Sequence, residues 1–205
     1  LRALNISDDL QCKMSTSEIM TFSIMSGMIY GCNYRLTRLM SLKHKYFPRI
    51  LSHSQLVRRI HKVPERAWGM VFLTLQFFLK NKENNCFIVD SFPVKAYENH
   101  KSFRAKIFSS KEFHGYCASK KQYFFGIKVH MIVNSDGVPI EFAFAPGRES
   151  DIKNFRNLNL NFSMGDLILG DKAYTDYSFE DILLESEGIQ LLARRKASHK
   201  RKHSS

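Results

Sequence analysis

Two short apolar runs in this chain each end in an aspartate, and this pattern restricts the fold more than any other feature of the sequence. Residues 86–90 read CFIVD and residues 166–171 read DLILGD. A short apolar run bounded by polar residues is best interpreted as a buried strand. An aspartate at the end of such a strand is costly to bury unless another group compensates its charge. The pattern therefore predicts a sheet that carries two carboxylates, those of Asp90 and Asp171.

The residues around these two runs predict a mixed α/β domain. The turn signal Ser135-Asp136-Gly137 joins two stretches of strand character into a hairpin. The expected elements are strands at 86–90, 123–134, 138–145, 166–171 and 189–193, with helices from 150 to about 158 and from 178 to a stop at Gly188. Their order is that of the RNase H-like fold, a mixed sheet with flanking helices.

The first eighty residues are expected to form a small all-α domain. Ser15-Thr16-Ser17-Glu18 fits a capping box that starts a helix over 19–30. Further helices are expected over 55–62, after a second start signal at Ser52, and over 67–79. The polar stretch 80–85 (KNKENN) has the composition of a linker. We therefore divide the chain into residues 1–80 and residues 81–205.

The charge balance points to a polyanionic partner. The chain has 31 Lys and Arg against 19 Asp and Glu, which gives a net charge of +12. A field of that sign attracts nucleic acid first and acidic membrane surfaces second. The longest apolar stretch, residues 19–31, is shorter than the roughly 20 residues that a spanning helix needs, so we expect no membrane span and no signal peptide. The four cysteines form no C-x-x-C pair, which argues against a zinc ribbon and favours reduced thiols in a cytoplasm.

Asp90 and Asp171 together suit a divalent metal ion. Mg²⁺ prefers oxygen ligands and is usually held by one or two carboxylates with phosphate oxygens and water. Phosphodiester chemistry with two metal ions needs carboxylates that converge from different elements of the fold. The spacing of the two aspartates is compatible with strands that lie side by side. The alternative is that each aspartate merely caps the turn that follows it.

Several stretches resemble DDE-type transposases of bacterial insertion sequences. They are IVDSFP at 88–93, GDLILGDKAY at 165–174, and the two hairpin segments KQYFFGIKVHMIV and PIEFAFAPGRESD. The resemblance runs from about Cys86 to Arg195, and it is weaker, though visible, in YFPRILSHSQLVRRI of the helical region. Several ordered motifs at matching spacing are a more specific signal than a single aspartate pattern.

The resemblance implies that Asp90 and Asp171 are the first two of three metal-binding carboxylates. The third, a glutamate on a helix after the last strand, has no match in the chain. Glu180, Glu185 and Glu187 all precede the last expected strand. We therefore expect the third carboxylate beyond Ser205, which would leave the C-terminal domain incomplete and this chain inactive on its own. The chain also begins at Leu1 rather than at methionine, as a fragment would.

The implied activity is metal-dependent cleavage at transposon ends followed by strand transfer into target DNA, with Mg²⁺ or Mn²⁺ as cofactor. The implied partners are double-stranded DNA and further copies of the chain, in the bacterial cytoplasm at the nucleoid. The helical residues 1–80 would bind the transposon end. Two alternatives stay open: a nuclease of the same fold that cuts without joining, and an inactive DNA-binding remnant of a transposase.

Basic residues in three regions are candidates for DNA contact. The insert 95–121 mixes basic and aromatic side chains, which suits phosphate contact with base stacking, or else a surface loop held in place by its aromatics. Arg58 and Arg59 suit a helix-turn-helix or, equally, a plain helical bundle. Residues 194–202 (RRKASHKRK) are either a DNA-backbone contact or an end produced by truncation. The residues expected to bind DNA are Arg58, Arg59, Lys101, Arg104, Lys106, Lys120, Lys121 and Lys172.

Other polar residues near the two carboxylates have structural interpretations. Asp151 is interpreted as a helix N-cap. His130 is interpreted as a hydrogen-bonded structural histidine rather than a metal ligand, and Tyr174 as a residue that packs at the end of a strand. Glu141 is a candidate cross-strand partner of Lys128 or His130.

Overall fold

Capping residues start the helices of the N-terminal region where the sequence predicts them. α1 (Thr16–Tyr30) follows Ser15, whose hydroxyl accepts a hydrogen bond from the Glu18 amide while the Glu18 carboxylate accepts one from the Ser15 amide. α3 (His53–His61) begins in the same way, with Ser52 as the cap and Gln55 as its partner. α2 (Tyr34–His44), capped by Asn33, lies between them and was not predicted as a separate helix. α4 (Glu65–Leu79) completes the helical region.

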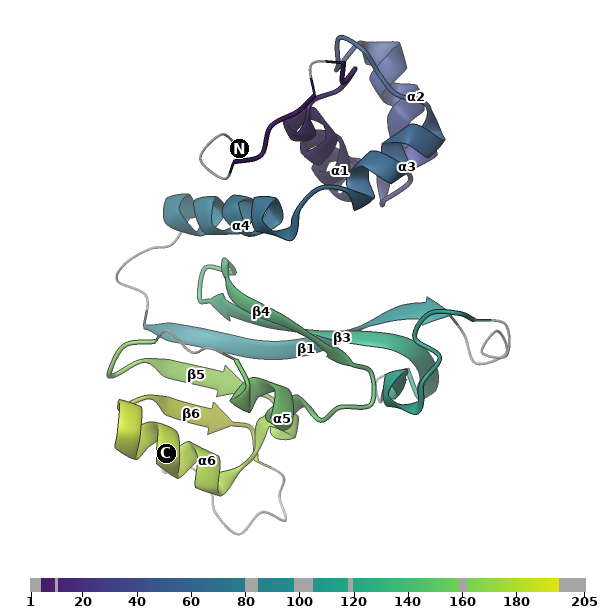
Figure 1. Ribbon diagram of the computed structural model, residues 1–205. Coiled ribbons are helices and arrows are strands. Elements are labelled where there is room, and N and C mark those ends of the chain that lie inside the picture. The colour runs from purple at the N-terminus through teal and green to yellow at the C-terminus, as the bar shows by residue number, and fades with distance from the viewer. Residues whose placement is uncertain are drawn as a thin grey trace. The chain divides into compact units, whose positions relative to one another are not determined.

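The chain divides into two units, Leu1–Leu75 and Gln76–Ser205, drawn in Figure 1. The computed structural model describes residues 5–9, 11–79, 85–97, 105–117, 120–158 and 162–195. In the first unit, the apolar core is built by five buried side chains, namely Met14, Ile19, Phe22, Leu51 and Leu56. Within the described ranges, the structure contains no helix whose length and apolar character would let it cross a lipid bilayer.

The second unit is built on one mixed sheet. Its strands are β1 (Cys86–Tyr97), β2 (His114–Cys117), β3 (Gln122–Asn134), β4 (Pro139–Pro146), β5 (Leu167–Gly170) and β6 (Gln190–Ala193). The strand order is β2-β3-β1-β5-β6, with β4 also paired to β3. β3 pairs antiparallel with β1, β2 and β4, whereas β5 runs parallel to both β1 and β6. This mixed sheet with flanking helices is the RNase H-like fold that the order of the sequence elements predicts.

Two features of the sheet differ from the sequence prediction. β1 does not end at Asp90 but continues to Tyr97, because its whole length pairs with β3. Pro93 is tolerated within it because the pairs with β5 end at Val89, so the missing N–H costs no hydrogen bond to β5. The second difference is β2, a strand inside the insert 95–121, where no strand was expected; the 3-10 turn η3 (Lys111–Phe113) leads into it.

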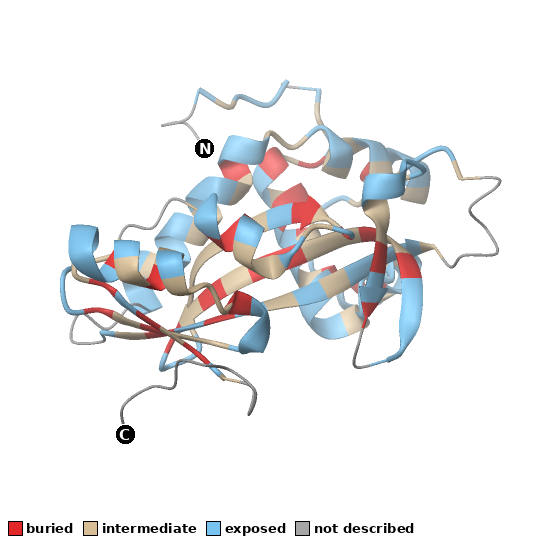
Figure 2. Cartoon of the chain, turned by 90° about the horizontal axis from the view of Figure 1, so that it is seen from below, coloured by how far each residue is buried: buried red, intermediate tan, exposed pale blue. Residues whose placement is uncertain are grey.

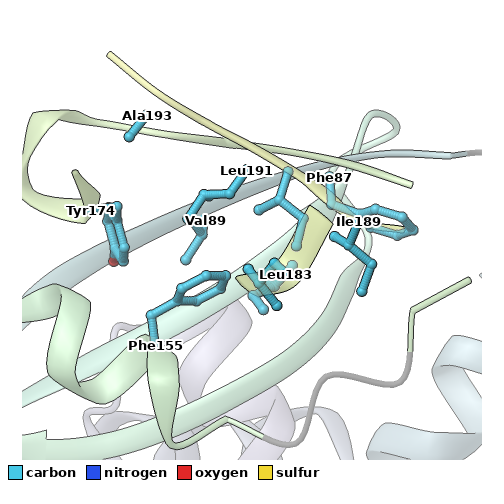
Figure 3. Close-up of a cluster of buried hydrophobic side chains, with 10 residues drawn as sticks. Phe87, Val89, Phe155, Tyr174, Leu183, Ile189, Leu191 and Ala193 are labelled. Atoms are coloured by element: carbon cyan, nitrogen blue, oxygen red, sulfur yellow. The ribbon is translucent and has the colours of Figure 1, made fainter. Parts of the chain in front are cut away.

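The helices of this unit cover one face of the sheet. They are α5 (Asp151–Arg156), the 3-10 turn η4 (Lys172–Tyr174), and α6 (Tyr177–Ile182) with its π-helical extension η5 (Leu183–Glu187). Figure 3 shows how their side chains meet those of the strands, for example Phe155 of α5 and Leu183 of η5 against Val89 and Leu191. Buried positions recur along the strands, as Figure 2 shows, while residues on the other face of β1, such as Ile88 and Phe92, are exposed.

An ion pair buried at the end of the described chain ties β6 to α6. The Arg195 and Glu180 side chains are 7% and 6% exposed, and Arg195 Nη1 donates to Glu180 Oε1 at 2.8 Å. The Arg195 guanidinium also lies 4.7 Å from the centroid of the Tyr177 ring. Arg195, which opens the basic stretch 194–202 with Arg194, therefore has a structural role; residues 196–202 lie outside the described ranges.

Substituting Glu180→Gln is expected to destabilise this unit by about 3–5 kcal/mol, because it leaves a buried guanidinium without a compensating charge. Lys153→Ala is the control: it removes an exposed ion pair with Glu149 on α5 and should cost about 0.3–0.5 kcal/mol. Urea unfolding followed by circular dichroism measures both. Trp68, the single tryptophan, lies in the helical unit, so its fluorescence follows the unfolding of that unit separately. If both variants lost the same free energy of unfolding, the structural role of the Glu180–Arg195 ion pair would be contradicted.

Candidate active site

The parallel pairing of β1 with β5 brings the two predicted aspartates together. The last pair of the ladder is Val89 with Gly170, and Asp90 and Asp171 are the next residue of each strand. Both aspartates are exposed, and both line one cleft of about 540 Å³, which we call the acid cleft. Its walls are formed by Asp90, Ser91, Pro93, Tyr116, Cys117, Phe124, Lys128, Asp151, Asp171, Lys172 and Ala173.

Local backbone contacts orient both carboxylates. Asp90 Oδ1 accepts a hydrogen bond from the Ser91 amide at 2.7 Å. Asp171 is the N-cap of η4, and its Oδ1 accepts one from the Ala173 amide at 2.7 Å. The turn-capping role considered for Asp171 is therefore present, but it uses one oxygen of the carboxylate. In the described part of the chain neither aspartate takes part in an ion pair.

Gly170 allows η4 to fold back onto the sheet directly after Asp171. A Cβ at this position would lie 3.1 Å from Tyr174 Cβ and 3.2 Å from a methyl group of Val89, which is tighter than ordinary contact. Tyr174 is 1% exposed and belongs to the buried hydrophobic core of this unit, as Figure 3 shows. Tyr174 thus packs at the end of β5, as the sequence interpretation states.

Asp151 forms a second polar group beside the two aspartates, and its predicted role as an N-cap is wrong. The cap of α5 is Ser150. The Asp151 carboxylate instead accepts hydrogen bonds from the Ser91 hydroxyl at 3.0 Å and from Lys128 Nζ at 2.9 Å. It therefore joins β1, β3 and α5 at the wall of the acid cleft.

The side of β3 that carries Lys128 and His130 is the side that packs against the core. The expected pairing of these residues with Glu141 does not form, because Glu141 stands opposite Ile132 and accepts a hydrogen bond from the Phe142 amide. His130 is fully buried, with Nδ1 3.4 Å from the Tyr174 hydroxyl and Nε2 3.8 Å from Asp151 Oδ1. It is a structural histidine, as predicted.

The pKa values of two buried groups reflect the charges around the cleft. Burial raises the pKa of Tyr174, and the carboxylates of Asp151, Asp90 and Asp171 raise it further. Burial also lowers the pKa of His130; Asp151 is the largest of the opposing influences. All three aspartates therefore act on the same small region of the core.

The predicted DNA-binding residues fall into three groups. Lys172 is exposed at the acid cleft, and Lys106, Lys120 and Lys121 are exposed elsewhere in the second unit. In the helical unit Arg58 is exposed. Arg59 instead bonds Asp8 Oδ1 at 3.0 Å and the Met14 carbonyl at 3.1 Å. Lys101 and Arg104 lie outside the described residues.

The donor set of the acid cleft is compatible with Mg²⁺. In the described part of the chain no three His, Cys, Asp or Glu side chains form a metal-binding group on their own. Mg²⁺ needs no such group, because it is commonly held by one or two carboxylates together with phosphate oxygens and water. Asp90 and Asp171 supply two such carboxylates, whereas Asp151 is engaged by Lys128.

Asp90 and Asp171 thus lie at the end of the parallel β1–β5 pairing of an RNase H-like sheet. Residues 81–204, more than half of the chain, match the family model described as Transposase DDE domain, and the chain belongs to this family. Transposases of this family generally depend on divalent metal ions. No curated protein matches the chain.

The buried His130 predicts a loss of stability in acid. Because burial lowers its pKa in the folded protein below the ordinary value of 6.5, the unfolded chain takes up the proton first as the pH falls. The stabilisation is complete above pH 6.5 and declines as the pH falls toward the lowered value of the folded state. In urea unfolding on both sides of pH 6.5, His130→Gln should therefore show a weaker pH dependence than the unsubstituted protein.

His61→Gln, a substitution of an exposed histidine in the helical unit, is the matched control. It should retain the full pH dependence of the second unit. If His130→Gln loses as much stability in acid as the unsubstituted protein, protonation of His130 is not the cause.

Proposed function

We propose that the chain is the DNA-processing part of a transposase that cleaves transposon ends and joins them to target DNA, with Asp90 and Asp171 as metal-binding carboxylates. The observation that carries this proposal is the position of both aspartates, one residue past the last parallel pair of β1 and β5, in one cleft. A divalent ion bound there would activate the attacking oxygen and stabilise the leaving oxygen. Both steps of the reaction are in-line displacements, first by water and then by a freed 3′-hydroxyl, so one site can serve both.

The chain's own residues would prepare this chemistry. The Ser91 and Ala173 amides fix one oxygen of each carboxylate, which leaves the other oxygen for a ligand. Lys172, exposed at the cleft beside Asp171, would contact a phosphate. Residues 1–80 would bind the transposon end, in keeping with the exposed Arg58 of α3.

In an enzyme that also carries the third carboxylate, Asp90→Asn and Asp171→Asn should each abolish Mg²⁺-dependent cleavage of transposon-end DNA. Each should also weaken Mn²⁺ binding, measured by electron paramagnetic resonance. DNA binding should stay nearly unchanged, because it depends on the basic residues. Asp136→Asn, in the exposed turn between β3 and β4, is the control and should behave like the unsubstituted protein. A variant that cuts at the unsubstituted rate would show that its aspartate is not a ligand.

The assay with end-containing DNA, Mg²⁺ and a target plasmid also separates the alternatives. Cutting followed by joined products supports the transposase. Cutting without joining indicates a nuclease of the same fold. DNA binding without cleavage at any metal concentration indicates a non-enzymatic remnant.

The helical unit offers a matched pair of neighbouring arginines. Arg58→Ala should weaken DNA binding and lower the dependence of the binding constant on salt by about one phosphate contact. Arg59→Ala should leave that salt dependence unchanged and destabilise the helical unit by up to about 1 kcal/mol, because it removes the contact with Asp8. Fluorescence anisotropy and thermal unfolding measure the two effects. Equal losses of binding in both variants would contradict the separate roles.

The segment that connects α2 to α3 is too long for these two helices to form a helix-turn-helix. Residues 45–52 separate the two helices. This segment is longer than the turn of about three or four residues that the motif uses. Residues 62–64, which connect α3 to α4, do have that length, so Arg58 can belong to a helix-turn-helix of α3 and α4 or to a plain helical bundle.

A further inference from the structure

Two hollows of the second unit meet at Lys128 and Tyr116. One is the acid cleft. The other, also of about 540 Å³, is lined by basic and aromatic residues, and we call it the basic–aromatic groove. Its lining consists of Lys111, His114, Gly115, Tyr116, Tyr123, Lys128, Gly147 and Arg148. Because Lys128 and Tyr116 line both hollows, a ligand in one can continue into the other.

Lys128 is held in place at this junction. Its side chain is 16% exposed, and Nζ donates to the Glu149 carbonyl and to Asp151 Oδ1, both at 2.9 Å. A lysine ammonium has three N–H donors. Among the described residues two acceptors are engaged, so one donor remains for a ligand in the hollows that Lys128 lines.

The cleft needs a fixed positive charge if it is to accept a phosphate. Asp90, Asp151 and Asp171 all line it, and three carboxylates repel an incoming anion. Lys128 lies against one of them and offsets its charge. An ammonium anchored by two acceptors also loses little conformational freedom when it binds a phosphate.

The groove beyond Lys128 presents aromatic rings to solvent. Tyr116 and Tyr123 are 47% and 54% exposed, and their ring centroids are 4.9 Å apart across β2 and β3. His114 stacks on Tyr123 at 5.2 Å. Exposed rings between basic side chains suit unpaired bases, since every base can stack on them whatever its sequence.

Resting on the proposed function, we infer that the basic–aromatic groove binds the DNA strand that leaves the acid cleft, with its bases unpaired. Lys128 contacts the phosphate at the junction of the two hollows. Tyr116 and Tyr123 stack on the bases that follow. Asp151 is a positioning residue that holds the Lys128 ammonium in place.

The test is DNA binding in EDTA, where no cleavage takes place, with a blunt duplex and the same duplex carrying a single-stranded tail. Fluorescence anisotropy over a series of KCl concentrations gives the affinity and its salt dependence. Lys128→Gln, which keeps a donor for Asp151 and removes the charge, should lower the salt slope for tailed DNA by about one. Lys128→Arg should restore the slope. Lys153→Gln, at an exposed position of α5, is the control and should leave the slope unchanged.

The stacking role has its own substitutions. Tyr116→Leu and Tyr123→Leu should each weaken binding of the tailed duplex by about tenfold, the usual effect of losing one stacked base. Binding of the blunt duplex should change little. Equal losses on both DNAs would overturn the assignment of the groove to an unpaired strand.

The role of Asp151 is tested by a double-mutant cycle. Asp151→Ala should weaken binding of tailed DNA in the unsubstituted protein but have no further effect in Lys128→Gln, because it acts through that lysine. Asp151→Asn, which still accepts hydrogen bonds, should restore part of the affinity. Additive losses would show that Asp151 does not position Lys128.

The binding results are independent of the proposed activity. Binding as predicted, with no cleavage in Mg²⁺ by a protein that also carries the third carboxylate, would refute the transposase activity and leave the groove assigned. Cleavage in Mg²⁺ with an unchanged salt slope in Lys128→Gln would overturn the groove and leave the activity in place. Circular dichroism identifies any variant that fails to fold; the tyrosine substitutions then decide the assignment.

Discussion

The parallel pairing of β1 with β5 is the constraint on which the candidate site depends. It joins residues 86–89 to residues 167–170, so the site forms only after the intervening hairpin and α5 have packed. The pairing is held by the core beneath it, where Phe87, Val89 and Ile168 are nearly inaccessible to solvent. Asp90 and Asp171 are therefore placed by apolar burial, not by any attraction between them.

At the end of the β1–β5 pairing, charged carboxylates lie next to the apolar core. The core reaches Tyr174 and His130, while the next layer outward carries three aspartates. Asp90 and Asp171 are exposed at the cleft, whereas the Asp151 side chain is only 18% exposed, and a buried charge is costly without compensation. Lys128 compensates Asp151 directly, whereas Asp90 and Asp171 have hydrogen bonds from backbone amides and no partner cation among the described residues. That difference supports the proposal that Asp90 and Asp171 bind a metal ion, while Asp151 holds Lys128 in place.

Local patterns in the sequence predicted the parts of the fold that local chemistry determines. The capping box at Ser15, the helix start at Ser52, the turn that ends at Gly137 and the stop at Gly188 all lie where expected. The sequence also predicted the strands that the structure has at 167–170 and 190–193. For Asp90 and Asp171, the sequence showed only that their spacing is compatible with side-by-side strands; the parallel pairing of β1 with β5 in the structure is what brings them to one cleft.

What the sequence did not reveal depends on partners distant along the chain. The continuation of β1 beyond Asp90 and the formation of β2 are both set by pairing with β3. Asp151 looks like a cap from its neighbours alone, and its true partners, Ser91 and Lys128, come from two other elements. Likewise Arg58 and Arg59 are equivalent in sequence, and the position of Asp8 separates them.

The positions of the charged residues explain how a strongly basic chain can have an acidic candidate site. The chain is strongly basic, yet its candidate site is lined by three aspartates. An acidic cleft by itself would repel DNA, and a basic surface by itself would bind it without chemistry. The structure places both within a few residues of each other: Lys172 follows Asp171 directly, and Lys128 pairs with Asp151 while lining the groove beyond. In the proposed function, cations at the rim would thus hold the phosphate backbone, while Asp90 and Asp171, which have no ion-pair partner among the described residues, would be available to a metal ion.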